Sequence, residues 1–67
     1  MPSSVIDDFD YEAESNALTI RFRSGRLYRY RLVPETVVLA FAAARSKGAF
    51  FNRHIRDRYP VEELTSA

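Results

Sequence analysis

The feature that most constrains the fold is a run of alternating apolar residues over residues 18–30, interrupted once by Gly25. Three apolar residues alternate with polar ones before the glycine, and two tyrosines alternate with arginine after it: Leu18, Ile20, Phe22, Tyr28 and Tyr30. Alternation of this kind is typical of antiparallel strands with one buried face. The sequence therefore predicts a β-hairpin with Gly25 in its turn.

The length of that turn decides which side chains face the core. A two-residue loop pairs Ile20 with Arg29 and mixes apolar with charged residues on both faces. A three-residue loop over 23–25 pairs Ile20 with Tyr28 and places Gly25 where a type I turn with a G1 bulge requires a left-handed residue. Because a slip of one residue moves every side chain to the opposite face, the apolar pattern favours the three-residue loop. Both tyrosines are then expected in the core.

The segments on either side of the hairpin predict a further strand and two helices. A strand over 3–11 places Val5 and two aromatic residues on one face, with aspartates on the other. Pro34 fits the first position of a helix, where its missing N–H is not needed. Ser46 is a suitable N-cap for a second helix over Lys47–Arg58. One narrow stripe of this second helix is expected to face the sheet: Gly48, Phe51, Ile55 and Tyr59.

The predicted fold class is α+β, a three-stranded antiparallel meander followed by two helices packed on one face. The 67 residues are expected to form one domain, ordered over about residues 3–60, with a tail at 61–67. A domain this small buries only about 60% of the surface that its unfolded chain exposes, so its stability is marginal. No apolar run approaches the roughly 18 residues needed to cross a membrane, and the acidic N-terminus does not resemble a signal peptide. We expect a cytoplasmic protein that is a monomer or a weak dimer.

The residue types argue against catalytic and metal sites. The chain has no cysteine and a single histidine, His54, so neither a disulfide nor a set of zinc ligands can be assembled. No motif for a nucleophile, a paired-carboxylate site or a metalloprotease is present. We therefore expect no enzymatic activity, no metal and no cofactor.

Charge is distributed unevenly along the chain. Residues 1–14 carry five acidic residues and no basic one, whereas residues 21–58 carry nine arginines and Lys47 against two acidic residues. A basic block is compatible with a nucleic-acid partner, and arginine both binds phosphate bidentately and stacks on bases. The alternative is that the acidic segment pairs with the basic one, and the two interpretations can hold together.

Several short motifs carry a family resemblance that extends from Ser3 to Tyr59. They are Ser3-Ser4, Leu18-x-Ile20-x-Phe22-x-x-Gly25-x-x-Tyr28-x-Tyr30, Val33-Pro34 and Ser46-Lys47-Gly48-x-Phe50-Phe51-Asn52-x-x-Ile55-Arg56. Together they resemble the KTSC domain, named for its occurrence at the C-terminus of some lysyl-tRNA synthetases and also found as a small stand-alone bacterial or phage protein. RNA binding is implied only by that attachment to a synthetase. The resemblance assigns structural roles to Gly25, Tyr28, Tyr30, Ser46, Gly48, Phe51, Asn52 and Ile55.

Two groups of residues are candidates for nucleic-acid binding. The hairpin register places four arginines on the sheet face opposite the tyrosines, with a positive excess over the two aspartates expected there: Arg21, Arg23, Arg29 and Arg31. The second helix contributes Lys47, Phe50, Arg53 and Arg56.

Three residues of that helix leave alternatives open. Phe50 is either covered by the first helix or exposed for base stacking. The turn at Ser46 and Lys47 is either an anion site or a plain helix cap beside a solvated lysine. Asn52 is expected to satisfy the hydroxyl of a buried tyrosine.

Two functions follow from these candidates. The first is a non-enzymatic module that binds RNA or another nucleic acid weakly, through the phosphate backbone and without base-reading motifs. The alternative is a protein-interaction or structural adaptor domain that binds an acidic partner.

Overall fold

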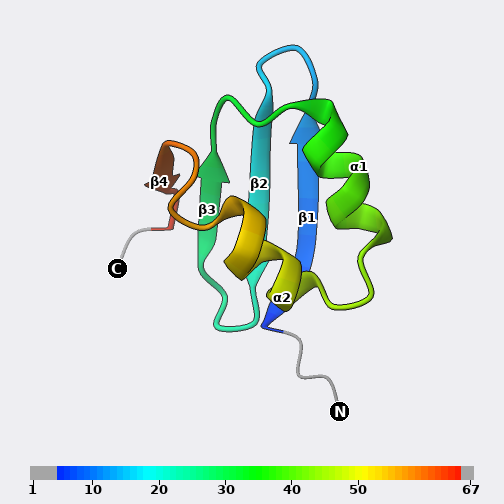
Figure 1. Cartoon of the computed structure of the whole chain (residues 1–67). Coiled ribbons are helices and arrows are strands. Elements are labelled where there is room, and N and C mark those ends of the chain that lie inside the picture. Colours follow the sequence, from blue (N-terminus) through cyan, green and yellow to red (C-terminus); the bar gives the residue numbers. More distant parts are fainter. Residues whose placement is uncertain (1–4, 66–67) are drawn as a thin grey trace.

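A four-stranded antiparallel sheet carries helices on one face (Figure 1). The computed structural model describes residues 5–65. Its elements are, in chain order, β1 (Ile6–Glu12), β2 (Ala17–Phe22), β3 (Leu27–Tyr30), α1 (Glu35–Ala43), α2 (Lys47–Phe50), η1 (Phe51–Ile55) and β4 (Val61–Glu63). The segment η1 continues α2 with π-helical winding. The strands lie in the order β1-β2-β3-β4, which confirms the predicted α+β class.

The predicted count of three strands was wrong, because residues 61–63 form β4 instead of belonging to a tail. Backbone hydrogen bonds hold both ends of this strand against β3: Arg31 N donates to Pro60 O, and Leu64 N donates to Leu27 O, each at 2.8 Å. All three residues of β4 are exposed. No alternation between apolar and polar side chains therefore marks the strand in the sequence.

The register predicted for the central hairpin is confirmed. Ile20 lies opposite Tyr28, and the N–H of Gly25 donates to the carbonyl of Phe22 at 2.8 Å. Gly25 has a φ of +95°, a region that residues with a Cβ avoid. The three-residue turn thus places both tyrosines on the face that carries the helices.

The first strand differs from the prediction at its beginning. The pairing register shifts between Ile6 and Asp8, so Asp7 is the extra residue of a β-bulge and the alternation of faces changes there. Ile6 is consequently buried, whereas Val5, which was predicted to face the core, is 49% exposed. After the bulge the pattern returns to the expected phase, with Phe9 partly buried against the core.

Both helices begin close to where the sequence predicts. Pro34 was predicted to be the first residue of the helix; it is the N-cap, and α1 begins at Glu35. The hydroxyl of Ser46 accepts a hydrogen bond from the N–H of Ala49 at 3.2 Å, which confirms its predicted role as an N-cap. The second helix was predicted to reach Arg58 but ends at Ile55.

The core lies between the sheet and the helices. Its largest fully buried side chains come from the sheet, the loop before α1 and both helices: Leu18, Ile20, Val33, Phe41 and Ile55. Phe51 packs edge-on against Phe22 and Tyr30, with ring centroids 5.3 and 5.5 Å apart. A Cβ added at Gly48 would lie 3.2 Å from the side chain of Val5, so the start of α2 packs closely against the residue that precedes β1. No helix within residues 5–65 is long and apolar enough to span a membrane.

Candidate functional site

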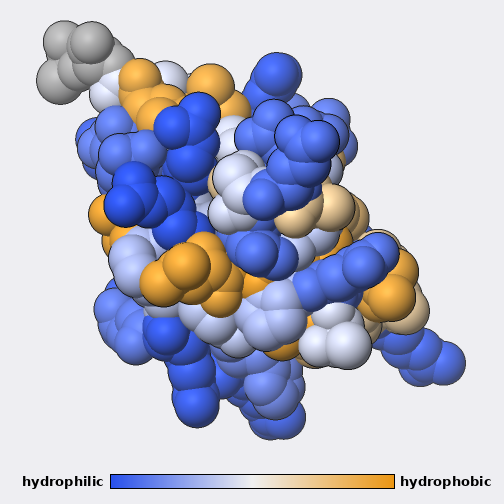
Figure 2. Space-filling model, turned by 90° about the horizontal axis from the view of Figure 1, so that it is seen from above, coloured by the Kyte–Doolittle hydropathy of each residue, from blue (hydrophilic) through white to orange (hydrophobic). Residues whose placement is uncertain are grey.

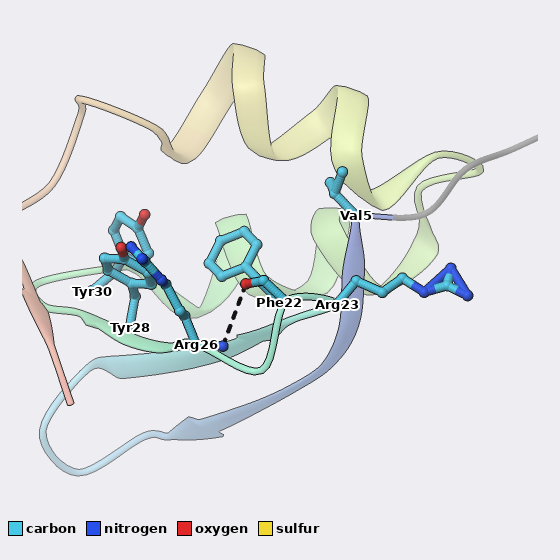
Figure 3. Close-up of a pocket in the computed structure, with 7 residues that line it drawn as sticks. Val5, Phe22, Arg23, Arg26, Tyr28 and Tyr30 are labelled. Atoms are coloured by element: carbon cyan, nitrogen blue, oxygen red, sulfur yellow. Dashed lines mark hydrogen bonds between the residues drawn. The ribbon is translucent and has the colours of Figure 1, made fainter. Parts of the chain in front are cut away.

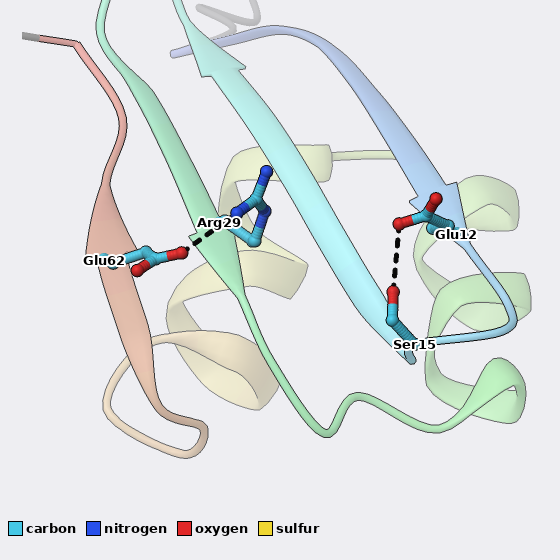
Figure 4. A network of polar contacts seen from close by, with 4 residues as sticks. All are labelled: Glu12, Ser15, Arg29 and Glu62. Carbon is cyan, nitrogen blue, oxygen red and sulfur yellow. Dashed lines mark hydrogen bonds and ion pairs between the residues drawn. The ribbon is translucent and has the colours of Figure 1, made fainter.

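The outer face, which is the sheet face that carries no helix, is balanced in charge and not basic as predicted. The Nη1 atom of Arg29 lies 3.0 Å from Oε2 of Glu62 in β4, and Asp8 is the partner of Arg21 in the ladder between β1 and β2. Figure 4 shows the Arg29 pair together with the hydrogen bond from Ser15 to Glu12. The expected positive excess was wrong because β4 adds Glu62 to this face, in addition to the aspartates of β1 that the prediction already included.

The remaining arginines of that predicted group lie apart from one another. Arg31 lies just beyond β3, exposed, and lines a shallow hollow on the outer face with Arg29 and Glu12. Arg23 lies in the hairpin turn, where its N–H donates to the carbonyl of Val5 at 2.8 Å. Its side chain lines a groove on the helix side of the sheet, so Arg23 does not belong to the outer face.

Lys47 has a structural role that the sequence analysis missed. Its ammonium group donates hydrogen bonds to the carbonyls of Ala42 and Ala44, at 3.1 and 2.9 Å. These carbonyls belong to the last turn of α1 and to its C-cap, where orphan acceptors and the helix dipole both favour a cation. Lys47 thus caps the C-terminal end of α1. The alternative in which its side chain extends into solvent was wrong.

Phe50 is half-buried, between the two alternatives left open by the sequence. Its ring centroid lies 5.7 Å from that of Phe41 and 4.6 Å from that of His54. With Val37, Tyr59 and neighbouring residues it lines a hollow of about 390 Å³ next to α1. Helix α1 therefore covers one side of the ring and leaves the other accessible.

The polar residues of η1 face solvent. Asn52 is exposed and its Oδ1 accepts a hydrogen bond from Nη1 of Arg56 at 3.4 Å, so the expectation that it satisfies a tyrosine hydroxyl was wrong. Arg56 also lies 4.0 Å from the carboxylate of Asp57. Arg53 is exposed on the same segment.

A groove with aromatic walls lies on the helix side of the sheet, at the β2–β3 turn. We call it the aromatic groove; its volume is about 410 Å³. Figure 3 shows the side chains that line it, with Ser24 in the adjoining turn: Val5, Phe22, Arg23, Arg26, Tyr28 and Tyr30. Tyr30 is buried, whereas Phe22 and Tyr28 are half-buried. The tyrosine pair of the family motif therefore belongs partly to the core and partly to this groove.

Arg26 is the cation most closely associated with the aromatic groove. Its side chain runs beside the ring of Tyr28, whereas Arg23 extends away from the rings (Figure 3). A hydrogen bond with Tyr28 and attraction by the Glu63 carboxylate hold the pKa of Arg26 above its usual value. The Arg26 side chain is exposed and lies at the mouth of the groove.

The electrostatic environment of Tyr30 reflects its burial. Removal of the phenol from water raises its pKa above the ordinary value, and the neighbouring Tyr28 acts in the same direction. Arg56 acts in the opposite direction. At neutral pH, Tyr30 therefore presents a neutral hydroxyl.

The end of the molecule that carries the β1–β2 turn has a mainly polar surface. Figure 2 shows this end as mainly hydrophilic, with small and separate hydrophobic patches. Leu32, in the loop that leads to α1, is 69% exposed. Single exposed apolar residues are normal on protein surfaces and do not indicate a binding site.

Sequence reasoning missed Arg26 as a site residue although the signal was available. The register that pairs Ile20 with Tyr28 also places Arg26 opposite Phe22, on the face of the tyrosines. Val5, which the predicted strand over 3–11 placed on the core face, lines the groove from the helix side of the sheet. Of the predicted binding residues only Arg23 lines this groove.

Comparisons with known proteins agree with the motif-based resemblance. The model of the KTSC domain matches residues 2–59. A lysine–tRNA ligase from Nostoc punctiforme is 42% identical over 62 residues, which cover 92% of this chain and 11% of the ligase. An uncharacterized protein from Stutzerimonas stutzeri is 37% identical, over 88% of this chain and 83% of that protein. The chain thus spans only about a tenth of the length of the ligases that it matches.

A solved structure supports the same assignment. The crystal structure of a KTSC domain protein from Yersinia pestis superimposes with a TM-score of 0.88 at 31% sequence identity, covering 97% of this chain and 94% of that one. Sequence, motifs and fold therefore agree, and the chain belongs to the KTSC domain family.

Proposed function

We propose that this domain is a small, non-enzymatic module that binds RNA weakly through its aromatic groove and acts in the cytoplasm. The observation that carries the proposal is the combination of three aromatic rings with an arginine at the mouth of one groove. Proteins that bind single-stranded nucleic acids combine accessible aromatic rings with cations that contact the backbone. The aromatic groove offers both kinds of contact within one site.

The charge distribution favours this groove over the outer face. On the outer face, carboxylates from β1 and β4 accompany the arginines of β2 and β3, and the exposed Arg29 is paired with Glu62. A phosphate group approaching that face meets repulsion as well as attraction. The outer-face arginines are consequently weaker candidates than the sequence alone indicated.

The relatives support RNA as the partner. The ligases that contain a matching segment are lysine–tRNA ligases, and tRNA appears in their names. Because this chain corresponds to about a tenth of such a ligase, the proposal transfers an association with RNA and not the ligase activity. Binding is expected to depend little on the identity of the bases, since the lining of the groove holds no side-chain set that reads base edges.

The proposal is tested by titrating the domain with tRNA and with an acidic protein while recording amide and side-chain NMR spectra. We expect tRNA to shift resonances of Phe22, Arg26 and Tyr28, and excess acidic protein to displace it poorly. Shifts caused by the acidic protein alone would instead favour the alternative of an adaptor domain. Absence of any shift with tRNA at low salt would contradict RNA binding.

A further inference from the structure

We infer that the aromatic groove takes one unpaired nucleotide, with the base among the rings and the phosphate at Arg26. The inference rests on the proposed function and adds the chemical class of ligand that its site accepts. It also predicts that unpaired RNA is preferred over duplex RNA.

The size of the groove limits its occupant. A volume of about 410 Å³ lies near the lower end of the roughly 300–1,000 Å³ that is typical of small-molecule sites. This space suits one base with its sugar and is too small for a base-paired segment. Since bases in an A-form duplex are paired and stacked, only a loop, a bulge or a strand end can present a base in this way.

The lining of the groove suits a flat aromatic ring. Tyr28 and Phe22 meet edge to face, with centroids 5.4 Å apart and planes at 86°, and neither ring is fully buried. Val5, which is 49% exposed, adds an aliphatic surface. Stacking on such rings tolerates every base because each base has a π-face.

Arg26 adds the contact that a nucleotide requires beyond its base. Its exposed side chain lines the groove beside Tyr28, so a phosphate can reach the guanidinium from solvent. A guanidinium has five N–H donors and can bind a phosphate through two of them at once. Charge complementarity therefore favours a nucleotide over an uncharged aromatic ligand.

The negative charge of Glu63 should repel the phosphate bound at Arg26. Removing this charge should therefore have the opposite effect on nucleotide affinity to removing Arg26. Its carboxylate attracts Arg26 and accepts a hydrogen bond from the hydroxyl of Thr65 at 2.9 Å. A glutamine at this position keeps the shape and removes the negative charge. Glu63→Gln should therefore tighten nucleotide binding, whereas the loss of Arg26 should weaken it.

The experiment uses the full chain and four ligands in NMR titrations: AMP, ribose 5-phosphate, a short single-stranded RNA, and an RNA duplex. We expect AMP at millimolar concentration and the single strand to shift the ring resonances of Phe22, Tyr28 and Tyr30. Ribose 5-phosphate should move these rings much less, because it lacks the base. The duplex should bind more weakly than the single strand.

Variants assign the binding to individual groups. Tyr28→Leu should weaken binding of AMP and of the single strand by about 5- to 150-fold, the range expected for one lost base–aromatic stack. If the Tyr28→Leu variant does not fold, Arg26→Gln serves in its place. It changes an exposed side chain and should weaken binding of AMP and of the single strand. Arg21→Gln, on the outer face of the same hairpin, is the matched control and should leave both affinities unchanged.

The outcomes separate this inference from the function on which it rests. If the single strand binds but the shifts map to Arg21, Arg29 and Arg31, the groove is not the site although RNA binding stands. If AMP and ribose 5-phosphate act alike, no base enters the groove and the inference is overturned. If no RNA binds to any surface, the proposed function itself fails. An acidic peptide that shifts the groove where RNA does not would overturn both and indicate a protein partner.

Discussion

Leu32 holds a backbone conformation that leucine rarely adopts. Its φ is +61°, in the left-handed region that costs about 1–2 kcal/mol for a residue with a Cβ, and the side chain is 69% exposed. Hydrogen bonds on both sides impose this conformation: Arg31 N donates to Pro60 O at 2.8 Å, and Val33 N donates to Asn16 O at 3.0 Å. The strain therefore comes from the joining of β3 to α1 and not from the packing of the leucine.

We expect Leu32→Asn to raise the free energy of unfolding by about 1 kcal/mol, because asparagine tolerates the left-handed region better. The shift of the urea midpoint at an unchanged m-value measures the effect. Leu39→Asn is the matched control, since Leu39 is 62% exposed and lies within α1. There the same substitution should lower stability by about 0.5 kcal/mol through helix propensity. A loss of stability in both variants would show that Leu32 is not strained.

The buried phenol of Tyr30 makes stability sensitive to alkaline pH. Burial raises its pKa in the folded protein above the ordinary value of 10.0, so the unfolded chain loses this proton first as the pH rises. The stabilisation by the neutral form is present in full below about pH 10 and is lost as the pH rises through the folded-state pKa. We expect Tyr30→Phe to lose less stability than the native chain between neutral pH and the alkaline range. Equal losses in urea titrations at pH 7 and pH 10.5 would contradict this.

Among the secondary-structure features, the hairpin and the N-cap of the second helix were predictable from the sequence. Strand β4 and the hydrogen bonds from Lys47 to the end of α1 were not. The hairpin register follows from the apolar alternation through Ile20 and Tyr28, because a slip would expose the whole set. The N-cap at Ser46 follows from a local hydrogen bond. β4 buries no side chain, and the carbonyls that Lys47 binds become its neighbours only after the chain has turned between α1 and α2. Neither of the two alternatives for the turn at Ser46 and Lys47 includes those contacts.

The same difference limited the prediction of the candidate site. The family motif and the hairpin register placed Tyr28 and Tyr30 on the correct face. The same register already separated Arg26 from the outer-face arginines. The charge balance of the outer face was not predictable, because Glu62 reaches it only through the long-range pairing of β4 with β3.

Lys47 should contribute to the stability of α1 because its ammonium closes the carbonyl end of that helix. We expect Lys47→Met, which keeps an apolar stem of similar length, to lower the free energy of unfolding by about 1 kcal/mol through two lost charged hydrogen bonds. Arg45→Met is the control, since Arg45 is exposed and adjacent, and surface changes of this kind usually stay within about 0.5 kcal/mol. Equal stability of the Lys47 variant and the native chain would restore the alternative of a merely solvated lysine.

At the scale of the whole molecule, folding partly cancels the separation of charge that the sequence shows. The acidic β1 lies at one edge of the sheet and β4, which carries Glu62 and Glu63, at the other. The arginines of β2 and β3 lie between them. A net charge of +1 therefore gives little long-range attraction for a polyanion, and binding depends on a few local contacts.

The salt dependence of RNA binding tests this view of the whole molecule. For a single strand, the slope of log K against log salt concentration changes by about 0.7 for each phosphate contact. We expect Arg26→Gln to reduce the magnitude of the slope by about that amount, because one guanidinium–phosphate contact is lost. The double variant Arg29→Gln, Glu62→Gln removes a pair whose atoms lie 3.0 Å apart and leaves the net charge unchanged, so its slope should equal that of the native chain. The contrary outcome is a reduced slope for the double variant together with an unchanged slope for Arg26→Gln. It would place the phosphate on the outer face and show that Arg29 binds RNA despite its ion pair with Glu62.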